Sequence, residues 1–243
     1  MKISELFHSI QGEGKRTGVP SFFIRTNFCN LRCKFSSGNL CDTSYTSWFP
    51  DDKKNLGEME VKEILNEYRK FNSRDIVISG GEPTMYLNEL TELCAEIKNI
   101  DRNIFITIET NGTDIGDFVK DADLISISPK LSTSIPFGTE YEKMHERNRM
   151  NIDAFKNYND LKTKNLIDIQ WKFVYSTDDD IKEIKELQMS AGFKDNDVYL
   201  MPEGISEEDL KSNRLKTIDA SLKNNFNYTD RIHILAWGNK RGV

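Results

Sequence analysis

The chain of 243 residues contains no run of 18 apolar residues, and its first stretch, MKISELFHSIQGEG, lacks a basic segment followed by an apolar one. The first absence argues against a membrane-spanning helix and the second against a secretory signal, so the sequence predicts a cytoplasmic protein. Positive charge is not in excess either, since 33 Lys and Arg stand against 39 Asp and Glu. The net charge of −6 argues against non-specific binding to nucleic acid or to an anionic membrane.

Long linkers, internal repeats and low-complexity tracts are also missing from the sequence. A hydrophobic fraction of 37% is enough for a sizeable core. We therefore expect a single domain over residues 1–243.

Cysteine is scarce, with four residues in all, and three of them fall within the segment 29–41. In a reducing cytosol such a group indicates a metal site or a catalytic site more often than disulfide bonds. Cys94 stands apart, at helical spacing with neighbouring apolar residues, and is predicted to be a core thiol.

Hydrophobic periodicity predicts an alternation of strands and helices along the chain. The expected strands are Ser21–Asn27, Asp75–Ser79, Asn103–Thr110, Leu124–Ser128, Ile167–Tyr175, Val198–Met201 and Arg231–Trp237. The expected helices are Glu58–Phe71, Leu87–Lys98, Ile115–Lys120, Asp178–Ala191 and Ser206–Asn225, and the acidic run that begins at Asp178 is expected to cap its helix.

Such an alternation is typical of right-handed βαβ units and a parallel sheet, and about six units favour an open, partial (β/α)6-type barrel of the α/β class. Ligands bind at the carboxyl ends of the strands in sheets of this kind. Polar and cysteine-bearing segments follow four of the predicted strands, so we expect the functional site at that edge.

The cysteines are spaced Cys29-x3-Cys33-x7-Cys41 on a loop after a predicted strand. Three thiolates would leave one iron of a [4Fe–4S] cluster without a protein ligand, and an open iron can bind a cofactor. The alternative is a zinc site completed by a histidine, for which His8 is the nearest candidate, although a Cys-x2-Cys pair would be expected there.

A Gly-Gly-Glu-Pro turn, residues 80–83, follows the second predicted strand. Glycine lets the backbone approach a ligand closely, and proline is well placed at the start of a helix. We expect Glu82 to accept hydrogen bonds from an ammonium group.

The cysteine loop followed by this turn resembles the radical S-adenosylmethionine (radical SAM) superfamily. The segments Ile10–Gly14 (IQGEG), Ser128–Lys130 (SPK) and Trp237–Val243 (WGNKRGV) are similar to a narrower family, 7-carboxy-7-deazaguanine synthase. The resemblance covers essentially the whole chain and implies a radical SAM barrel.

It also implies an activity. S-adenosylmethionine on the open iron of a [4Fe–4S] cluster would give a 5′-deoxyadenosyl radical, which takes a hydrogen from C6 of 6-carboxy-5,6,7,8-tetrahydropterin. Ring contraction with loss of ammonia would give 7-carboxy-7-deazaguanine, a precursor in 7-deazapurine (queuosine or archaeosine) biosynthesis. The resemblance further implies Mg²⁺, an electron donor such as flavodoxin or ferredoxin, and a homodimer.

The site residues are carried over by their position in these motifs. Cys29, Cys33 and Cys41 would hold the cluster, and Thr43 the magnesium. The substrate would contact Ile10, Gln11, Gly12, Arg25, Ser79 and Val243, with Arg25 pairing with its carboxylate. The S-adenosylmethionine site would comprise Leu40, Cys41, Asp42, Gly81, Glu82, Ser128, Pro129, Lys130 and Lys172.

Two departures from the superfamily pattern concern the cysteine loop. Seven residues separate the second and third cysteines where two are usual, and loop growth of this size costs little closure entropy. Leu40 stands where an aromatic residue usually precedes the last cysteine, so the contact to adenine would come from Leu40 or from Phe35.

Other functions remain open at this point. A glycyl-radical-enzyme activase shares the cysteine loop, although the first and last motifs disfavour it, and a non-catalytic zinc-binding module or an electron-transfer protein are further alternatives. Of the remaining histidines, His145 is predicted to be solvated and His233 to be a structural residue of the last strand.

Overall fold

The computed structural model describes residues 1–71 and 73–243. Nine strands form one sheet in the order β3-β1-β2-β4-β5-β6-β7-β8-β9. From β2 to β9 all neighbours are parallel, whereas β1 pairs antiparallel with β2 and β3. The strands are β1 (Lys2–Ile10), β2 (Pro20–Thr26), β3 (Gly57–Glu58), β4 (Asp75–Gly80), β5 (Phe105–Thr110), β6 (Leu124–Ile127), β7 (Asp168–Tyr175), β8 (Val198–Pro202) and β9 (Asn227–Tyr228).

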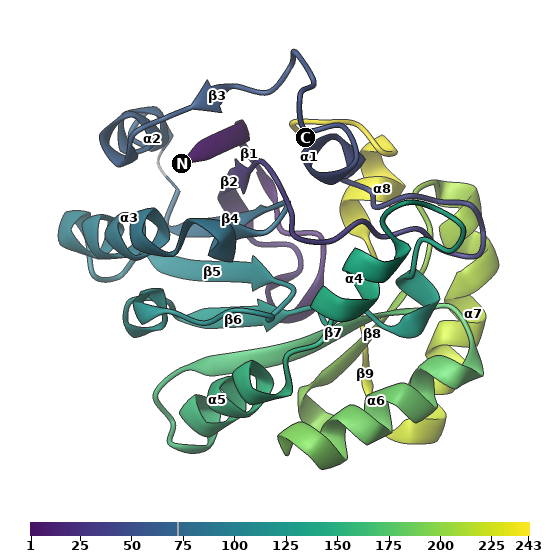
Figure 1. Cartoon of the computed structure of the whole chain (residues 1–243). Coiled ribbons are helices and arrows are strands. Elements are labelled where there is room, and N and C mark those ends of the chain that lie inside the picture. Colours follow the sequence, from purple (N-terminus) through teal and green to yellow (C-terminus); the bar gives the residue numbers. More distant parts are fainter. Residues whose placement is uncertain (72) are drawn as a thin grey trace.

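The helices are α1 (Ser44–Ser47), α2 (Val61–Tyr68), α3 (Leu87–Ile100), α4 (Glu142–Asn148), α5 (Ile152–Thr163), α6 (Asp178–Ala191), α7 (Glu207–Asn224) and α8 (Ile232–Trp237). The longer ones cover the outside of the curved sheet, whereas α4 lies beside the cysteine loop and α8 follows the last strand (Figure 1). The expected α/β class and the open, partial barrel are confirmed, because β3 and β9 end the sheet without pairing with each other.

The core lies between the sheet and the helices, where strand residues such as Ile78, Ile106 and Ile125 are fully buried. Cys94 on α3 belongs to this core and is also fully buried, which confirms its prediction as a core thiol. The acidic run at the start of α6 caps that helix as expected, since Thr177 and Asp180 form a capping box.

The predicted strand Arg231–Trp237 is wrong, because these residues form helix α8. The short strand β9 has already taken the last place in the sheet, so the following apolar residues turn back over the barrel. The N–H of Ile232 donates to the carbonyl of Gly12 at 3.1 Å, which ties α8 to the loop after β1. Short apolar runs do not distinguish strand from helix by periodicity alone.

The elements that were not expected from the sequence include β1, α4 and α5, together with the short α1, β3 and β9. Strand β1 mixes polar and apolar residues and lies near the edge of the sheet. Helix α5 carries a recognisable start signal, because the Asn151 side chain accepts the N–H of Ala154. The helix expected near Ile115–Lys120 is a single 3₁₀ turn, Asp117–Lys120.

His145 on α4 is fully buried, so the prediction that it is solvated is wrong. Burial, followed by the nearby charges of Arg149 and Lys130, lowers its pKa to about 4. The polar sequence of α4 gives no sign of this burial, because the helix packs against the cysteine loop rather than against the apolar core, with the N–H of Arg32 bonded to His145.

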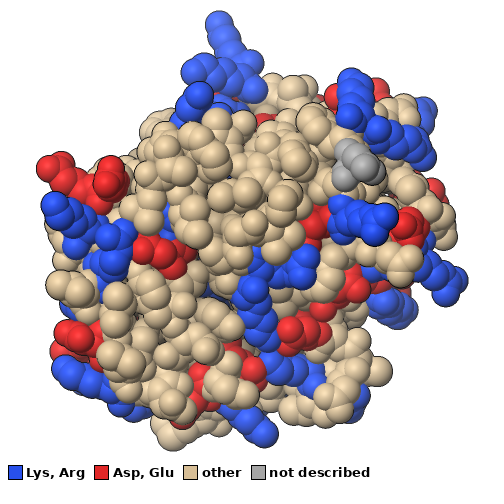
Figure 2. Space-filling view, turned by 180° about the vertical axis from the view of Figure 1, so that it is seen from behind, with Lys and Arg blue, Asp and Glu red and all other residues tan. Residues whose placement is uncertain are grey.

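Across the part of the chain that the structure describes, no helix is both long and apolar enough to span a membrane. Lys and Arg alternate with Asp and Glu around much of the face shown in Figure 2, in agreement with the mixed charge of the sequence.

Candidate active site

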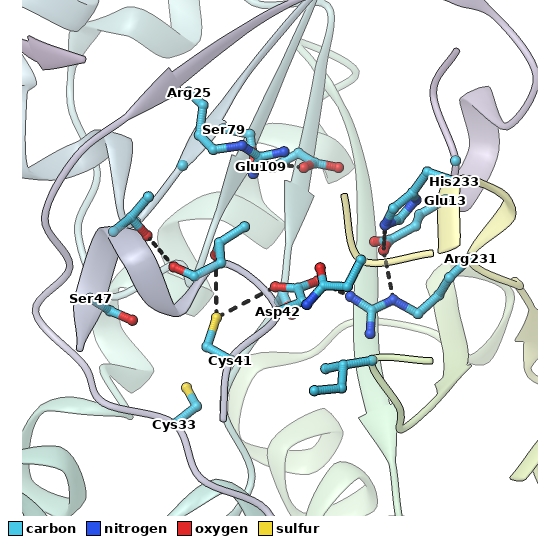
Figure 3. Close-up of a pocket in the computed structure, with 18 of the residues that line it drawn as sticks. Glu13, Arg25, Cys33, Cys41, Asp42, Ser47, Ser79, Glu109, Arg231 and His233 are labelled. Carbon is cyan, nitrogen blue, oxygen red and sulfur yellow. Dashed lines mark hydrogen bonds and ion pairs between the residues drawn. The ribbon is translucent and has the colours of Figure 1, made fainter. Parts of the chain in front are cut away.

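One pocket opens at the carboxyl ends of the parallel strands, where the site was expected (Figure 3). Its walls come from the loop after β1, the cysteine loop after β2, the turn after β4 and the ends of β5 to β8. All predicted site residues except Pro129 line it. The elements that were predicted separately therefore meet in one place.

Cys29, Cys33 and Cys41 all line this pocket, and none of them forms a disulfide. Burial raises the pKa of Cys29 to about 12 and also raises that of Cys33, so the thiolates need a positive centre beside them. A group of iron ions supplies such a centre, and thiolates are the ligands that iron–sulfur clusters use. The three thiols thus fit a cluster with one open iron.

A single zinc ion fits less well. Thiolates around one zinc lie about 3.8 Å apart, given Zn–S bonds of about 2.3 Å and a tetrahedral angle. In the described part of the chain, one group of three metal-ligating side chains has its ligand atoms within 4.8 Å of one another. Its members are Glu13, Asp42 and His233, so the cysteine thiols do not lie as close together as a single zinc ion requires. His8, the histidine considered for the alternative zinc site, is exposed on β1 and stacks on Phe71 with ring centroids 5.6 Å apart, which does not support that alternative.

The enlarged segment between Cys33 and Cys41 folds into a small hairpin, closed by a bridge between Lys34 and Leu40. At its tip, Asn39 Nδ2 donates to Glu203 Oε1 at 2.9 Å and to Asp209 at 3.3 Å. The insertion is therefore fixed to the opposite rim of the pocket, beyond β8. Both Phe35 and Leu40 line the pocket, and a contact from either of them to an adenine stays a prediction.

Gly81 is the point where the Gly-Gly-Glu-Pro turn touches the cysteine loop. A β-carbon on Gly81 would lie 1.9 Å from the carbonyl oxygen of Phe28, so only glycine fits. The N–H of Glu82 donates to the same carbonyl at 2.8 Å. Backbone contact between the two loops is thus direct.

Glu82 is buried, and its carboxylate accepts hydrogen bonds from Thr84, from Thr110 Oγ1 at 2.7 Å and from the N–H of Asn111 at 2.7 Å. Burial raises the pKa of this carboxyl, while these bonds act in the opposite direction. The carboxylate therefore joins the ends of β4 and β5, and a contact to an ammonium group stays a prediction.

Arg25 extends from β2 into the pocket toward Glu109 (Figure 3). Its Nε donates to Glu5 Oε1 at 2.8 Å, and Tyr45 donates to the same oxygen at 2.6 Å. Because Glu5 uses only the inner edge of the guanidinium, its terminal nitrogens remain suited to an anionic ligand. Sequence reasoning missed Glu5 because β1 was not expected, and it missed Tyr45 because the short helix α1 was not expected either.

A chain of charges crosses the pocket floor. Lys172 Nζ lies 2.5 Å from Glu13 Oε2 and 3.3 Å from Glu109 Oε1. Burial favours the neutral form of Glu13, but the positive charges of Lys172 and Arg231 outweigh the burial and lower the pKa of Glu13. Burial also favours the neutral form of Lys172, but the carboxylates of Glu109 and Glu13 raise its pKa. Glu13 and Lys172 are therefore both charged at neutral pH, and the predicted cofactor residue Lys172 is already paired with carboxylates.

Arg231 and His233 bring α8 into the site. Arg231 forms ion pairs with both Glu13 and Asp42, so it links the loop after β1 to the cysteine loop. Burial lowers the pKa of His233 to about 4, and a β-carbon on Gly12 would lie 2.3 Å from its Nδ1. His233 is thus a pocket residue and not a strand residue; the wrong strand assignment concealed it.

The remaining predicted residues occupy the rim and the floor. Ser79 Oγ donates to Glu109 Oε2 at 2.8 Å, and Gln11 Nε2 donates to the other oxygen at 3.3 Å. Lys130 Nζ donates to the carbonyl of Ser128 at 2.6 Å, and both residues line the pocket, whereas Pro129 between them does not. Ile10, Asp42, Thr43 and Val243 also line the pocket.

Comparisons with known proteins agree with this arrangement. Residues 23–212 match the family model described as the Radical SAM superfamily. The 7-carboxy-7-deazaguanine synthase of Rhodopirellula baltica is 36% identical over 244 residues, which cover 99% of this chain and 88% of the relative. That of Halobacterium salinarum is 33% identical over 253 residues, covering 98% and 90%.

The crystal structure of QueE from Escherichia coli has a similar fold, with a TM-score of 0.61 at 22% identity over 94% of this chain and 92% of that chain. From the family match and the relatives of nearly equal length, the chain belongs to the radical SAM superfamily and, within it, to the 7-carboxy-7-deazaguanine synthases.

Proposed function

We propose that this protein is a radical SAM carbon–nitrogen lyase that converts 6-carboxy-5,6,7,8-tetrahydropterin to 7-carboxy-7-deazaguanine with loss of ammonia. The observation that carries the proposal is the meeting of three free cysteines and an arginine in one pocket at the carboxyl ends of the strands. The curated relatives named above bear the same activity in their names.

Cys29, Cys33 and Cys41 would hold a [4Fe–4S] cluster, and S-adenosylmethionine would bind beside it. Together, when bound, these two groups supply the radical chemistry. The protein's own task is to hold the reactants in register and to keep water away from them. The stacked pair Phe7 and Phe23, with ring centroids 4.9 Å apart, supplies an apolar wall of the pocket for this purpose.

The substrate carboxylate would pair with the terminal nitrogens of Arg25. Such a pair is charge-assisted and directional, so it would fix one end of the pterin. Glu5 and Tyr45 support this role because they hold Arg25 in place without occupying its outer edge. Ile10, Gln11 and Gly12 would contact the other parts of the substrate.

S-adenosylmethionine would lie between the cysteine hairpin and the turn after β4, with contacts to the segments Leu40–Asp42, Gly81–Glu82 and Ser128–Lys130, and to Lys172. We further propose that Mg²⁺ binds at Thr43, beside the substrate carboxylate. The Thr43 hydroxyl, 3.3 Å from Cys41 Sγ, lines the pocket and offers the oxygen ligand that this ion prefers.

Three properties beyond the site belong to the proposal: an electron donor such as flavodoxin or ferredoxin, a homodimer, and a cytoplasmic location. The family resemblance supports all three, and the net charge of −6 agrees with a protein that does not bind anionic surfaces. Light scattering of the purified protein tests the dimer directly, since the chain mass is 28.1 kDa.

Anaerobic turnover after cluster reconstitution tests the reaction. The protein receives S-adenosylmethionine, a reductant, magnesium and the carboxypterin, and the products are identified by mass spectrometry. We expect 5′-deoxyadenosine and 7-carboxy-7-deazaguanine, both lost in Cys29→Ala and retained in Cys94→Ala, the matched core thiol.

The other outcomes refute different parts of the proposal. Slow formation of 5′-deoxyadenosine without the deazapurine would refute the substrate and retain the radical chemistry. A colourless protein with one zinc and no iron would refute the reaction as a whole.

A further inference from the structure

His145 lies outside the pocket lining, yet its ring contacts the cysteine loop directly. Its Nδ1 accepts the N–H of Arg32 at 3.2 Å, and its Nε2 lies 3.2 Å from Ser134 Oγ. The Ser134 hydroxyl donates its proton to the carbonyl of Leu131 at 2.7 Å, so Nε2 must be the donor to Ser134. A neutral imidazole has one donor and one acceptor, and both are used here.

One of these bonds holds the backbone before Cys33, and the residue at the end of the other holds the backbone after it. Arg32 precedes that cysteine, and its N–H ends on His145; Lys34 follows it, and its N–H donates to the carbonyl of Ser134 at 3.0 Å. Ser134 is itself buried, and its hydroxyl accepts a hydrogen bond from His145 Nε2. His145 therefore bonds directly to one anchor of the loop and contacts the residue that provides the other.

The carbonyl of Cys33 is fixed as well. It accepts the N–H of Cys41 at 3.2 Å and the indole N–H of Trp48 at 3.0 Å. With the anchors at Arg32 and Lys34, the peptide groups around Cys33 have defined partners, and the remaining freedom is the side-chain rotation of the thiol. Such an arrangement prepares the thiol for its metal before the metal arrives.

An ordinary core histidine would be satisfied by any nearby polar group. Both bonds of His145, in contrast, end on the segment that carries Cys33 or on the residue that holds this segment. Helix α4 and the cysteine loop lie side by side in Figure 1, although 113 positions separate His145 from Arg32 in the sequence.

We propose that His145 is a positioning residue for the iron–sulfur cluster, which keeps the backbone around Cys33 in the conformation that binds iron. The role rests on the cluster site proposed above, and it concerns the retention of the cluster rather than the reaction on the substrate.

Three substitutions separate the two bonds. His145→Phe keeps a ring and removes both bonds. His145→Asn places an amide oxygen near the position of Nδ1, so the N–H of Arg32 keeps an acceptor. The longer side chain of His145→Gln reaches toward Ser134 instead and leaves the N–H of Arg32 without a partner. Cys94→Ala serves as a control for a general loss of core packing.

The measurement is the rate at which the reconstituted, anaerobic protein loses its cluster to an iron chelator, followed by its visible absorbance and iron content. A buried N–H without a partner costs enough to speed this loss roughly tenfold in His145→Phe and His145→Gln. We expect His145→Asn to stay within roughly twofold of the wild type. The EPR signal of the reduced cluster should change in His145→Phe and His145→Gln but not in His145→Asn.

A purely structural role would lower the melting temperature of the metal-free protein, as we expect for Cys94→Ala, without changing cluster loss or the EPR signal. That result, or equal rates of loss in all variants, would overturn the inference. A wild-type protein that takes up no iron would instead refute the proposed function, so the two failures are distinguishable.

Discussion

Replacement of Gly81 by alanine tests the contact between the Gly-Gly-Glu-Pro turn and the cysteine loop. The new β-carbon would lie 1.9 Å from the Phe28 carbonyl oxygen and 2.4 Å from the carbonyl carbon. Restoring an ordinary separation requires about 1.5 Å of movement. Backbone atoms on both sides form the contact, so no side-chain rotation can provide this movement, and the loop that carries Cys29 has to shift.

The expected effects differ between stability and activity. Overpacking of this kind costs about 1–3 kcal/mol of the free energy of unfolding, which lowers the melting temperature of a chain of this length by about 2–12 °C. Misplacement by about 1 Å at a reacting centre costs roughly 100-fold in rate. We therefore expect Gly81→Ala to remain folded, to lose its cluster readily and to make little 5′-deoxyadenosine.

Gly57→Ala is the matched control. Gly57 has a φ of +90° and no heavy atom within 4 Å of an added β-carbon, so this variant bears a conformational cost of about 1–2 kcal/mol without a steric one. Circular dichroism melts, iron content and product formation are measured for both variants. If Gly81→Ala retains wild-type activity and iron content, the backbone contact does not position the cluster and the reasoning is refuted.

Three further predictions concern other parts of the site. Arg241 contacts Glu5, and its guanidinium carbon lies 3.8 Å from the ring centroid of Tyr45. Arg241→Ala should therefore free the C-terminal segment and raise KM for the pterin roughly tenfold, with substitution of the exposed Lys240 by alanine as the control. An unchanged KM in Arg241→Ala would contradict this prediction. Glu82→Gln places an amide donor against the Thr110 hydroxyl or the Asn111 N–H, which already donate to Glu82. The midpoint of urea unfolding should therefore fall by the equivalent of about 1–3 kcal/mol in the free energy of unfolding. An unchanged midpoint would show that the hydrogen bonds to Glu82 are dispensable. For His145, the folded pKa of about 4 lies below the unfolded value of 6.5, so the unfolded chain binds the proton first and stability is lost as the pH falls from 6.5 toward 4. The loss should reach about 2 kcal/mol at pH 5 and shrink in His145→Phe, and parallel pH profiles of urea unfolding for the two proteins would argue against it.

The parallel strands and the position of the site were predictable because their signals are local. An apolar strand such as Asp75–Gly80, followed by a glycine-rich turn, defines both the strand and the edge at which ligands bind. The cysteine spacing then restricts the chemistry at that edge. The structure confirms that these segments meet, since Cys29, Gly81 and Lys130 line one pocket.

The contacts that complete the site depend on distant parts of the chain and carry no local signal. Glu203 lies at the end of β8, yet it binds the tip of the cysteine hairpin, and nothing in its neighbourhood predicts that partner. Arg231 and His233 were concealed for a different reason, because an apolar run of six residues fits either a strand or a helix. His145 was placed in solvent because α4 is polar on most of its surface.

The cysteine hairpin is held by partners that follow it at great distance in the sequence, with separations of 113 positions for His145 and 170 for Asp209. During synthesis at about 5–20 residues per second, Asp209 is made roughly 10–30 s after Asn39. Until then the three thiols belong to an unsupported loop, open to oxidants and to stray metal ions. The loop therefore gains its full support for a cluster only after most of the chain has been translated.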